Sequence, residues 1–242
     1  MKRSAAVTAG ALSIAVLTGL TACGSGDSET DAAADKPKPE ATASRAKEVS
    51  PAERLAKLVI TPADVGGHNV EELEEEFIFA KSQDEVTLDK KVCAPLAYAM
   101  NQLPVGEPQA DLTRVASKDA NGSTYVTLNA YEDDGKAESA MAGLSKAVDS
   151  CGTGFTVEAN GNTSPYDSVT AEKADPAGDE SVAFKSTMTF RGVSHTVHTA
   201  AVRSDDVIAV YFAVDGRAIA ESRPSDTKVS PDVAKAQNAK LG

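Results

Sequence analysis

One segment near the end of the chain, residues 206–214 with the sequence DVIAVYFAV, constrains the fold more than any other. Side chains along a β-strand point alternately to the two faces of a sheet. Here the residues of both alternations are apolar, so a strand with this sequence needs cover on each of its faces. We therefore expect residues 206–214 at the centre of a sheet that has packed elements on both sides.

Other strands are predicted where apolar and polar residues alternate over a short run. With the central segment, the predicted strands cover residues 77–79, 124–131, 155–159, 181–190, 193–203 and 206–214. Arg191-Gly192 and residues 204–206 supply turns between the last three, which indicates an antiparallel meander. Residues 160–165 are rich in Gly, Asn, Ser and Pro, and are predicted to form a turn.

Helices are predicted where apolar residues recur at helical spacing. These segments are residues 51–60, 89–103, 134–151 and 230–242. The first has Ser50 as a candidate N-cap and Pro51 at its first position. Helices placed among segregated hairpin strands indicate an α+β fold. We expect a mainly antiparallel sheet of about five to six strands with helices packed on it, in a single extracellular domain over residues 51–242.

The start of the chain has the pattern of an export signal. Lys2 and Arg3 precede an uncharged run, residues 5–20, which is too short to span a bilayer stably. The following Leu20-Thr21-Ala22-Cys23 resembles the lipobox of bacterial lipoproteins. That resemblance implies acylation of the Cys23 thiol and cleavage of residues 1–22, and hence a lipid anchor in the cell membrane on its extracytoplasmic face. The alternative is an ordinary signal peptide that happens to contain a cysteine.

Residues 23–50 have the composition of a tether. They are mostly Gly, Ser, Asp, Glu, Ala, Thr and Pro, with little apolar surface to bury, so we expect a lipid-anchored disordered linker. Cleavage removes two of the 24 basic residues and none of the 36 acidic ones, so the formal charge falls from −12 to −14. A chain this acidic is repelled by phosphate backbones, which argues against a nucleic-acid partner.

Two cysteines, Cys93 and Cys151, remain once Cys23 is acylated. A pair of cysteines in an exported domain most simply forms a disulfide, here between two helices or between a helix and its exit. Two free buried thiols are the alternative. A redox role is less favoured because the chain has no Cys-x-x-Cys spacing.

Several diffuse features of residues 51–241 resemble actinobacterial secreted lipoproteins with a PknH-like extracellular sensor domain. The features are the proline-started first helix, KKVCAPLA around Cys93, Cys151 at the end of an Ala-rich helix, GDESVAFKS, VRSDDVIAVYF and the final PDVAKAQNAKL. The resemblance implies an α+β domain with an antiparallel sheet and a ligand-binding cleft. In the resembled family, the sensor domain of the kinases is held by two disulfides, whereas this domain can form only one, so its cleft and loops are expected to differ. With no kinase domain or transmembrane helix, the sequence gives no reason to expect signalling through the same chain.

Known catalytic patterns are missing from the sequence. His195 and His198 lie three positions apart on a predicted strand and therefore point to opposite faces, which argues against a shared metal ion. His68 is isolated in a predicted turn. The sequence contains no Gly-x-Ser-x-Gly elbow and no Gly-rich phosphate loop, and its acidic runs are typical of solvated faces. We expect neither an enzyme nor a cofactor or metal.

The polar face of residues 124–131 is the candidate ligand-binding surface. Tyr125, Thr127, Asn129 and Tyr131 combine aromatic planes with hydrogen-bonding groups on one alternation. The alternative is that the tyrosines pack under a helix with their hydroxyls reaching water. The first functional hypothesis is a non-catalytic, sensor-like module that binds an unknown small molecule or cell-wall fragment. The second is an accessory lipoprotein that binds an envelope protein during cell-envelope assembly or regulates an exported enzyme.

Overall fold

A computed structural model describes residues 49–74, 78–119 and 122–242 of this chain. The predicted signal segment, Phe77 and all of the predicted linker except Val49 and Ser50 lie outside the described residues. Residues 46–242 form one compact unit. None of its described helices is both long and apolar enough to cross a lipid bilayer.

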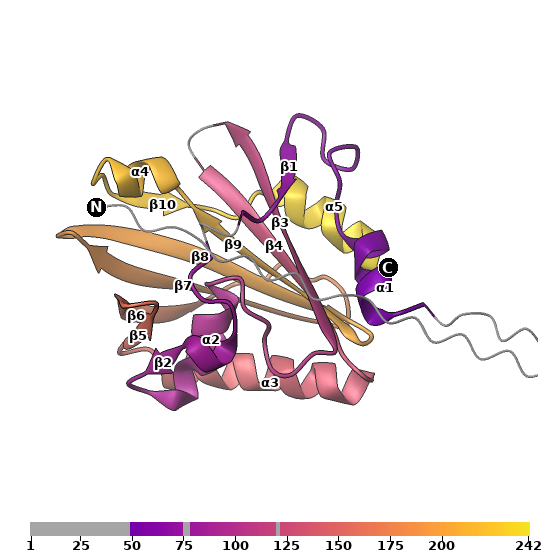
Figure 1. Cartoon of the computed structure of the whole chain (residues 1–242), viewed down its shortest axis with the longest axis horizontal. Helices are drawn as coiled ribbons and strands as arrows, with labels where there is room; N and C mark the ends of the chain where they lie inside the picture. Colours follow the sequence, from indigo (N-terminus) through magenta and orange to yellow (C-terminus); the bar gives the residue numbers. More distant parts are fainter. Residues whose placement is uncertain (1–48, 75–77, 120–121) are drawn as a thin grey trace, which may run out of the picture. The chain divides into compact units, whose positions relative to one another are not determined.

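One sheet of ten strands dominates the described part of the chain, in the order β1-β3-β4-β9-β8-β7-β6-β5-β2, with β10 beside β8 (Figure 1). The strands are β1 (Asn69–Glu72), β2 (Thr87–Leu88), β3 (Ala110–Asp119), β4 (Gly122–Ala130), β5 (Phe155–Ala159), β6 (Asn162–Glu172), β7 (Glu180–Phe190), β8 (Val193–Ser204), β9 (Val207–Val214) and β10 (Ser225–Thr227). Every pair in the main order is antiparallel, whereas β10 runs parallel to β8. The prediction of about five to six strands is wrong, although the α+β class and the mainly antiparallel pairing fit.

Strand β6 is not predicted from the sequence because residues 160–165 are expected to form a turn. Only Asn160 and Gly161 form the turn, with φ values of 50° and 74°, and β6 begins at once. Two successive residues with positive φ make the tight hairpin turn that matches strand twist. Pro165 is tolerated because β6 pairs with β7 only from Tyr166 onward, so Pro165 has a ladder partner on one side alone.

The other strands that the sequence does not predict, β1, β2, β3 and β10, lack a strong alternation of apolar and polar residues. In β3 only Ala116 is fully buried, and the strand is held by its pairing with β4 and β1. The strands β1, β2 and β10 have two to four residues each, and they form because a longer neighbour supplies their hydrogen-bond partners. Conversely, Ile78 and Phe79, predicted as extended, lie outside any strand; Phe79 packs against Ala80, Leu103 and Ala159 instead.

The helices follow their local capping signals. They are α1 (Pro51–Leu58), α2 (Ala94–Ala99), α3 (Asp134–Ser150), α4 (Gly216–Ala220) and α5 (Pro231–Leu241), with short 3₁₀ turns η2 (Gln83–Glu85) and η3 (Lys91–Cys93). Ser50 and Glu53 form a reciprocal capping box at the start of α1, and Asp133 accepts the Lys136 N–H at the start of α3. The helix predicted over residues 89–103 is shorter and ends at Ala99.

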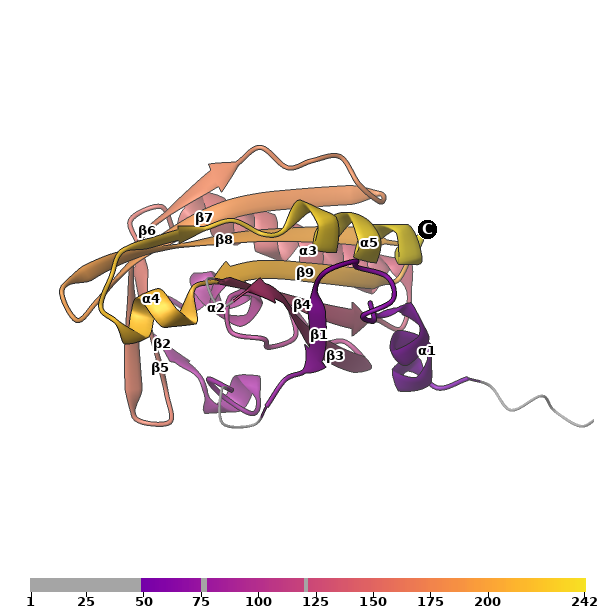
Figure 2. The same cartoon turned by 90° about the horizontal axis from the view of Figure 1, so that it is seen from above.

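Helices cover the sheet on both faces. The face covered by α2 and α3, which we call the disulfide face, buries a large core that includes Phe184, Ile208 and Phe212. The face covered by α1 and α5, which we call the terminal-helix face, buries Leu55 and Val233 with strand residues such as Leu128. In Figure 2 α5 lies over the long strands β7–β9 and α3 lies behind them.

Strand β9 is the element that both cores share. Seven of its eight residues are buried, and its side chains alternate between the disulfide face and the terminal-helix face. It lies between β4 and β8, well inside the sheet. The expectation of a central strand covered on each side is confirmed.

The predicted disulfide is also confirmed. Cys93 ends η3 at the start of α2, and Cys151 is the C-cap of α3, with 6.0 Å between their Cα atoms. Both residues are fully buried. The bond therefore links the start of α2 to the end of α3 on the disulfide face of the sheet.

Candidate functional site

A cavity of about 290 Å³ opens on the disulfide face of the sheet, beyond the end of α2. Strands β4, β6, β7, β8 and β9 form its floor, and the residues after Met100, the start of α4 and Ser225 of β10 form its walls. We call it the His195 cavity, because His195 is the buried polar side chain at its floor. Its position follows from the sheet: β9 leaves β8 after Thr199↔Phe212, and β10 takes the vacated place beside His195.

The imidazole of His195 is almost fully buried, with 2% of the residue exposed. Its Nδ1 lies 2.9 Å from the Ser225 hydroxyl oxygen. Its Nε2 has no hydrogen-bond partner among the described residues. A buried polar atom without a partner costs about 1–3 kcal/mol, so such atoms are rare unless a water or a ligand meets them.

Gln102 supplies a second polar atom of the same kind. Its side-chain Oε1 is buried and also lacks a partner in the described part of the chain. The backbone of Gln102 has a φ of 56°, in the left-handed region that non-glycine residues seldom adopt. Local strain of this type is often found where the chain positions a functional side chain.

The rest of the cavity wall is mostly aromatic and thioether surface. The Tyr125 ring stacks on Phe212 with 4.6 Å between the centroids and 5° between the planes. Tyr166, which stacks on Phe155, accepts a long hydrogen bond of 3.4 Å from the Asn101 amide. Met100 and Met188 complete this surface. Burial raises the pKa of both tyrosines, so their phenols stay neutral over the physiological range.

Charge is scarce around the cavity. Among its described lining residues, Asp215 is the single acidic or basic side chain apart from His195. The Asp215 carboxylate accepts the Ala218 N–H at 2.8 Å as the N-cap of α4, so one of its oxygens is committed to the helix. The site therefore offers one carboxylate and otherwise uncharged or imidazole hydrogen-bonding groups within mainly apolar walls.

The structure places the four residues of the predicted ligand-binding stripe in different settings. Tyr125 lines the His195 cavity, but Tyr131 is buried and its hydroxyl donates to the Val105 carbonyl. Thr127 bonds to Thr113 at 2.9 Å, and the Asn129 amide donates to the Ile208 carbonyl at 3.3 Å. Thr127, Asn129 and Tyr131 are each at most 2% exposed. They share a strand face, as alternation predicts, yet α3 and its neighbours cover that face.

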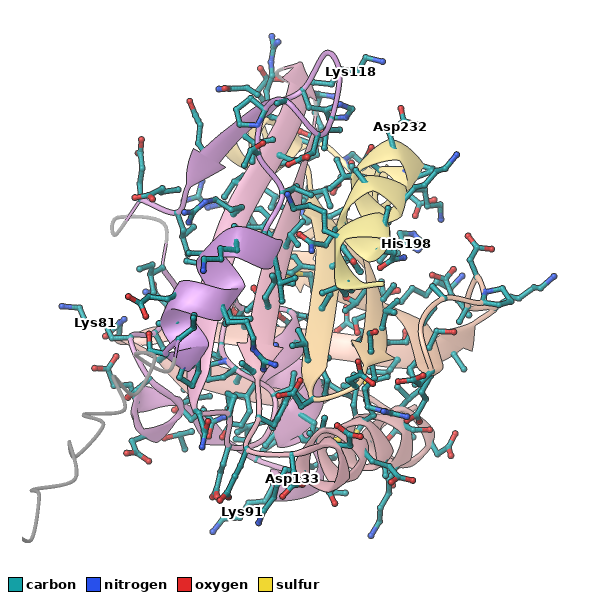
Figure 3. The ribbon with its side chains drawn as sticks, turned by 90° about the vertical axis from the view of Figure 1, so that its right-hand side faces the viewer. Lys81, Lys91, Lys118, Asp133, His198 and Asp232 are labelled. Atoms are coloured by element: carbon teal, nitrogen blue, oxygen red, sulfur yellow. A yellow bond between two sulfur atoms is a disulfide. The ribbon has the colours of Figure 1, made fainter. Side chains whose placement is uncertain are left out.

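His195 and His198 lie on opposite faces of β8. The ring nitrogens of His198 lie 2.6 Å from Glu172 Oε2 and 2.5 Å from Asp226 Oδ1, and Lys228 Nζ approaches the second nitrogen to 2.6 Å. Figure 3 shows His198 on the side of the sheet that carries α5. His68, from the predicted turn, approaches Ser230 at 3.3 Å. No group of three or more His, Cys, Asp or Glu side chains within the described ranges is arranged to hold a metal ion.

A second, wider hollow of about 760 Å³ lies along the edge strand β1 and its neighbour β3. Its walls carry Lys81, Asp84, Glu107 and Arg114, and Gln102 separates it from the His195 cavity. It is a solvated, charged groove. Of the two, the His195 cavity is the more enclosed and has the fewer charged side chains among its described lining residues, as expected of a small-molecule site.

Sequence reasoning missed His195 and Gln102 as site residues. The sequence does indicate that His195 is buried, because it lies on the same face of the predicted strand as the apolar Val197 and Ala201. Its spacing to His198, however, suggests a metal site rather than a ligand-binding site. The sequence gives no comparable indication for Gln102. Its role depends on the path of the chain after α2, which no local pattern specifies.

No protein-family model matches this chain, and no curated protein matches it. Among solved structures it is similar to the extracellular domain of PknH from Mycobacterium tuberculosis, with 13% identity and a TM-score of 0.47 over 78% of this chain and 93% of that chain. It is also similar to an uncharacterized Rv0999 ortholog from Mycobacterium smegmatis, with 13% identity and a TM-score of 0.40 over 77% and 92% of the two chains. The first is the sensor domain that the sequence features resemble.

Proposed function

We propose that this chain is a non-catalytic binding module, carried by a lipid anchor on the extracytoplasmic face of the membrane, and that it holds a small molecule in the His195 cavity. One observation carries the proposal: a half-open cavity on the disulfide face is lined mostly by aromatic, aliphatic, thioether and neutral polar side chains, with the buried His195 at its floor. The cavity volume of about 290 Å³ is close to the lower end of the range for ligand pockets, about 300–1,000 Å³.

The chemistry of the site favours binding over catalysis. A serine nucleophile needs a histidine base that a third group orients from the other ring nitrogen. Ser225 and His195 are 2.9 Å apart, but no carboxylate meets the second nitrogen of His195 in the described part of the chain. The contact instead ties β10 to β8 and fixes the orientation of the imidazole ring.

The location part of the proposal depends on the sequence alone. Leu20-Thr21-Ala22-Cys23 fits the lipobox, and the polar residues that follow have the composition of a spacer. A disulfide between Cys93 and Cys151 is compatible with an oxidising compartment. Anchor, spacer and binding domain together describe a receptor held near the membrane surface.

The binding function is testable with naphthalene as a probe on the full chain in detergent. The chain has no tryptophan, so naphthalene fluorescence can be followed without indole background. We expect saturable binding that raises the melting temperature. Val214→Phe, which fills the cavity, should abolish binding, whereas Thr170→Phe, at an exposed position in β6, should leave it unchanged. No saturable binding to the parent chain, or equal binding to the Val214→Phe variant, would refute the function.

A further inference from the structure

We infer that the ligand of the His195 cavity is an amphipathic organic cation, whose apolar body lies against the cavity walls and whose charged group meets the Asp215 carboxylate. This inference rests on the proposed binding function and specifies the chemical class of its ligand. Three observations carry it: the position of Asp215, the carboxylate oxygen that its helix cap does not use, and the apolar surface of the remaining walls.

Asp215 lies at the wall of the cavity, where strand β9 passes into helix α4. It follows Val214, the last residue of β9, and it is the N-cap of α4. Val214 and Asp215 both line the cavity, and Ile219, one helical turn further on, lines it as well. The Asp215 side chain is half-buried. A molecule that fills the cavity therefore lies beside this carboxylate.

The helix cap uses only one oxygen of the carboxylate. Asp215 Oδ1 accepts the Ala218 N–H, and no hydrogen bond joins Oδ2 to another described residue. A carboxylate accepts several hydrogen bonds, so Asp215 can cap the helix and bind an ammonium group at the same time. The two arginines of this region are paired elsewhere, because Arg217 and Arg223 each contact Glu221 at 2.8 Å.

The charge of the cavity favours a cation over an anion. An ion that leaves water for a mainly apolar site needs a counter-charge, because its desolvation otherwise opposes binding. The Asp215 carboxylate supplies that charge to a cation and repels an anion, and no lysine or arginine is among the described lining residues. The Nε2 atom of His195 is buried, and its Nδ1 faces Ser225. The formal charge of the chain, −12, acts in the same direction as Asp215.

The remaining walls favour an organic cation over a metal ion. Met100, Met188 and Val214 line the cavity together with several aromatic side chains, and this surface is covered only by a ligand with an apolar body. Thioether side chains adapt to bodies of different outline. A metal ion would leave the surface uncovered, and it would find one carboxylate where hard cations in proteins take several oxygen ligands.

Three probes that share a naphthalene ring and differ in one group test the inference. We would titrate the full chain in uncharged detergent at neutral pH with 2-naphthylmethylammonium, 2-naphthylmethanol and 2-naphthoate, which are positive, neutral and negative. The ammonium should bind about fivefold more tightly than the alcohol, and the carboxylate about fivefold more weakly, as expected for one partly solvated charge pair.

Asp215→Asn removes the charge and keeps a residue that caps helices well. In this variant the affinities of the ammonium and the alcohol should lie within twofold of each other. Asp84→Asn, which removes a carboxylate from the wall of the wider hollow, is the matched control and should keep the order of the parent chain. Val214→Phe, which fills the cavity, should abolish binding of all three probes.

The outcomes separate this inference from the binding function. If the alcohol binds to the parent chain but not to Val214→Phe, the binding function stands. If the ammonium then binds no more tightly than the alcohol, or if its advantage survives Asp215→Asn, the inferred class is wrong. If none of the three probes binds, both fail. Should Asp215→Asn not fold, Asp215→Ser, which also caps helices, tests the same preference.

Discussion

His195 and His198 are close in sequence, yet β8 gives them opposite chemical surroundings. His195 faces the cavity with one partner, the Ser225 hydroxyl. His198, on the other face, is enclosed by Glu172, Asp226 and Lys228 and is 4% exposed. Both histidines contact β10 through successive residues, because Ser225 and Asp226 also alternate between the two faces. These two contacts hold the short strand β10 to the sheet from both sides.

The Asp226 carboxylate should make stability depend on pH in the acid range. Its hydrogen bond with His198, and to a lesser extent Lys228, lowers its pKa below the ordinary value. A lowered pKa in the folded state adds stability above the unfolded value of about 3.9, and that stability is lost as the pH falls through the folded value. The carboxylate is largely exposed, so the contribution should be below about 1 kcal/mol.

Urea unfolding of the parent chain and of Asp226→Asn from pH 7 to pH 2.5 would measure this contribution. The parent should be the more stable above the unfolded pKa of about 3.9, and the two curves should converge as the pH falls through the lowered pKa of the folded state. Asp175→Asn, at an exposed position between β6 and β7, is a matched control and should run parallel to the parent. A constant difference between the parent and Asp226→Asn across the whole range would contradict the assigned pKa shift.

At the scale of elements, the connections of the sheet depend on a few backbone positions. Gly154 follows the disulfide-bonded end of α3 and begins the path into β5, with a φ of 76°. A Cβ atom added to it would lie 2.1 Å from the Tyr166 carbonyl oxygen of the neighbouring strand β6. Gly161, in the β5–β6 turn, has nearly the same φ, 74°, but a Cβ atom there would meet nothing within 4 Å.

The two glycines form a matched pair for mutation. Gly161→Ala should cost about 1 kcal/mol, because only the left-handed backbone conformation is penalised. Gly154→Ala carries the same backbone penalty and also forces β5 away from β6, so we expect at least about 2 kcal/mol more. Chemical denaturation measures both. Equal costs would show that β5 and β6 can separate at this point without loss.

Local signals predicted four of the five described helices, all but α4, and the sheet less completely. Ser50 and Pro51 act within one turn of the helix that they start, so the sequence alone identifies them. Strand β10 depends on β8, which is distant in sequence, and β3 pairs with its hairpin neighbour β4 although it lacks a strong apolar alternation. Strand β6 contains a proline that only its unequal pairing tolerates. Alternation correctly places Tyr125 and Tyr131 on the same face of the strand. It does not show that Tyr131 is covered by packed elements whereas Tyr125 lines a cavity.

At the scale of the whole molecule, the anchor proposed at Cys23 should decide where the binding domain is found. Cys23→Ser removes the thiol that accepts the lipid, so the variant should move from the membrane fraction to the soluble fraction or remain as an unprocessed precursor. Mass spectrometry of the mature parent should show acylation at an N-terminal Cys23. An unmodified Cys23 in the purified chain, or a membrane-bound Cys23→Ser variant with its signal segment removed, would contradict the anchor.

The last part of the chain serves both faces of the sheet in turn. After β9, residues 215–225 wall the cavity on the disulfide face, and α5 then covers the terminal-helix face. A chain cut at Asp215 would therefore open the His195 cavity and uncover the opposite core in a single step. Removal of this tail by a protease, or its displacement by a partner, would therefore destabilise the domain and at the same time release any molecule held in the cavity.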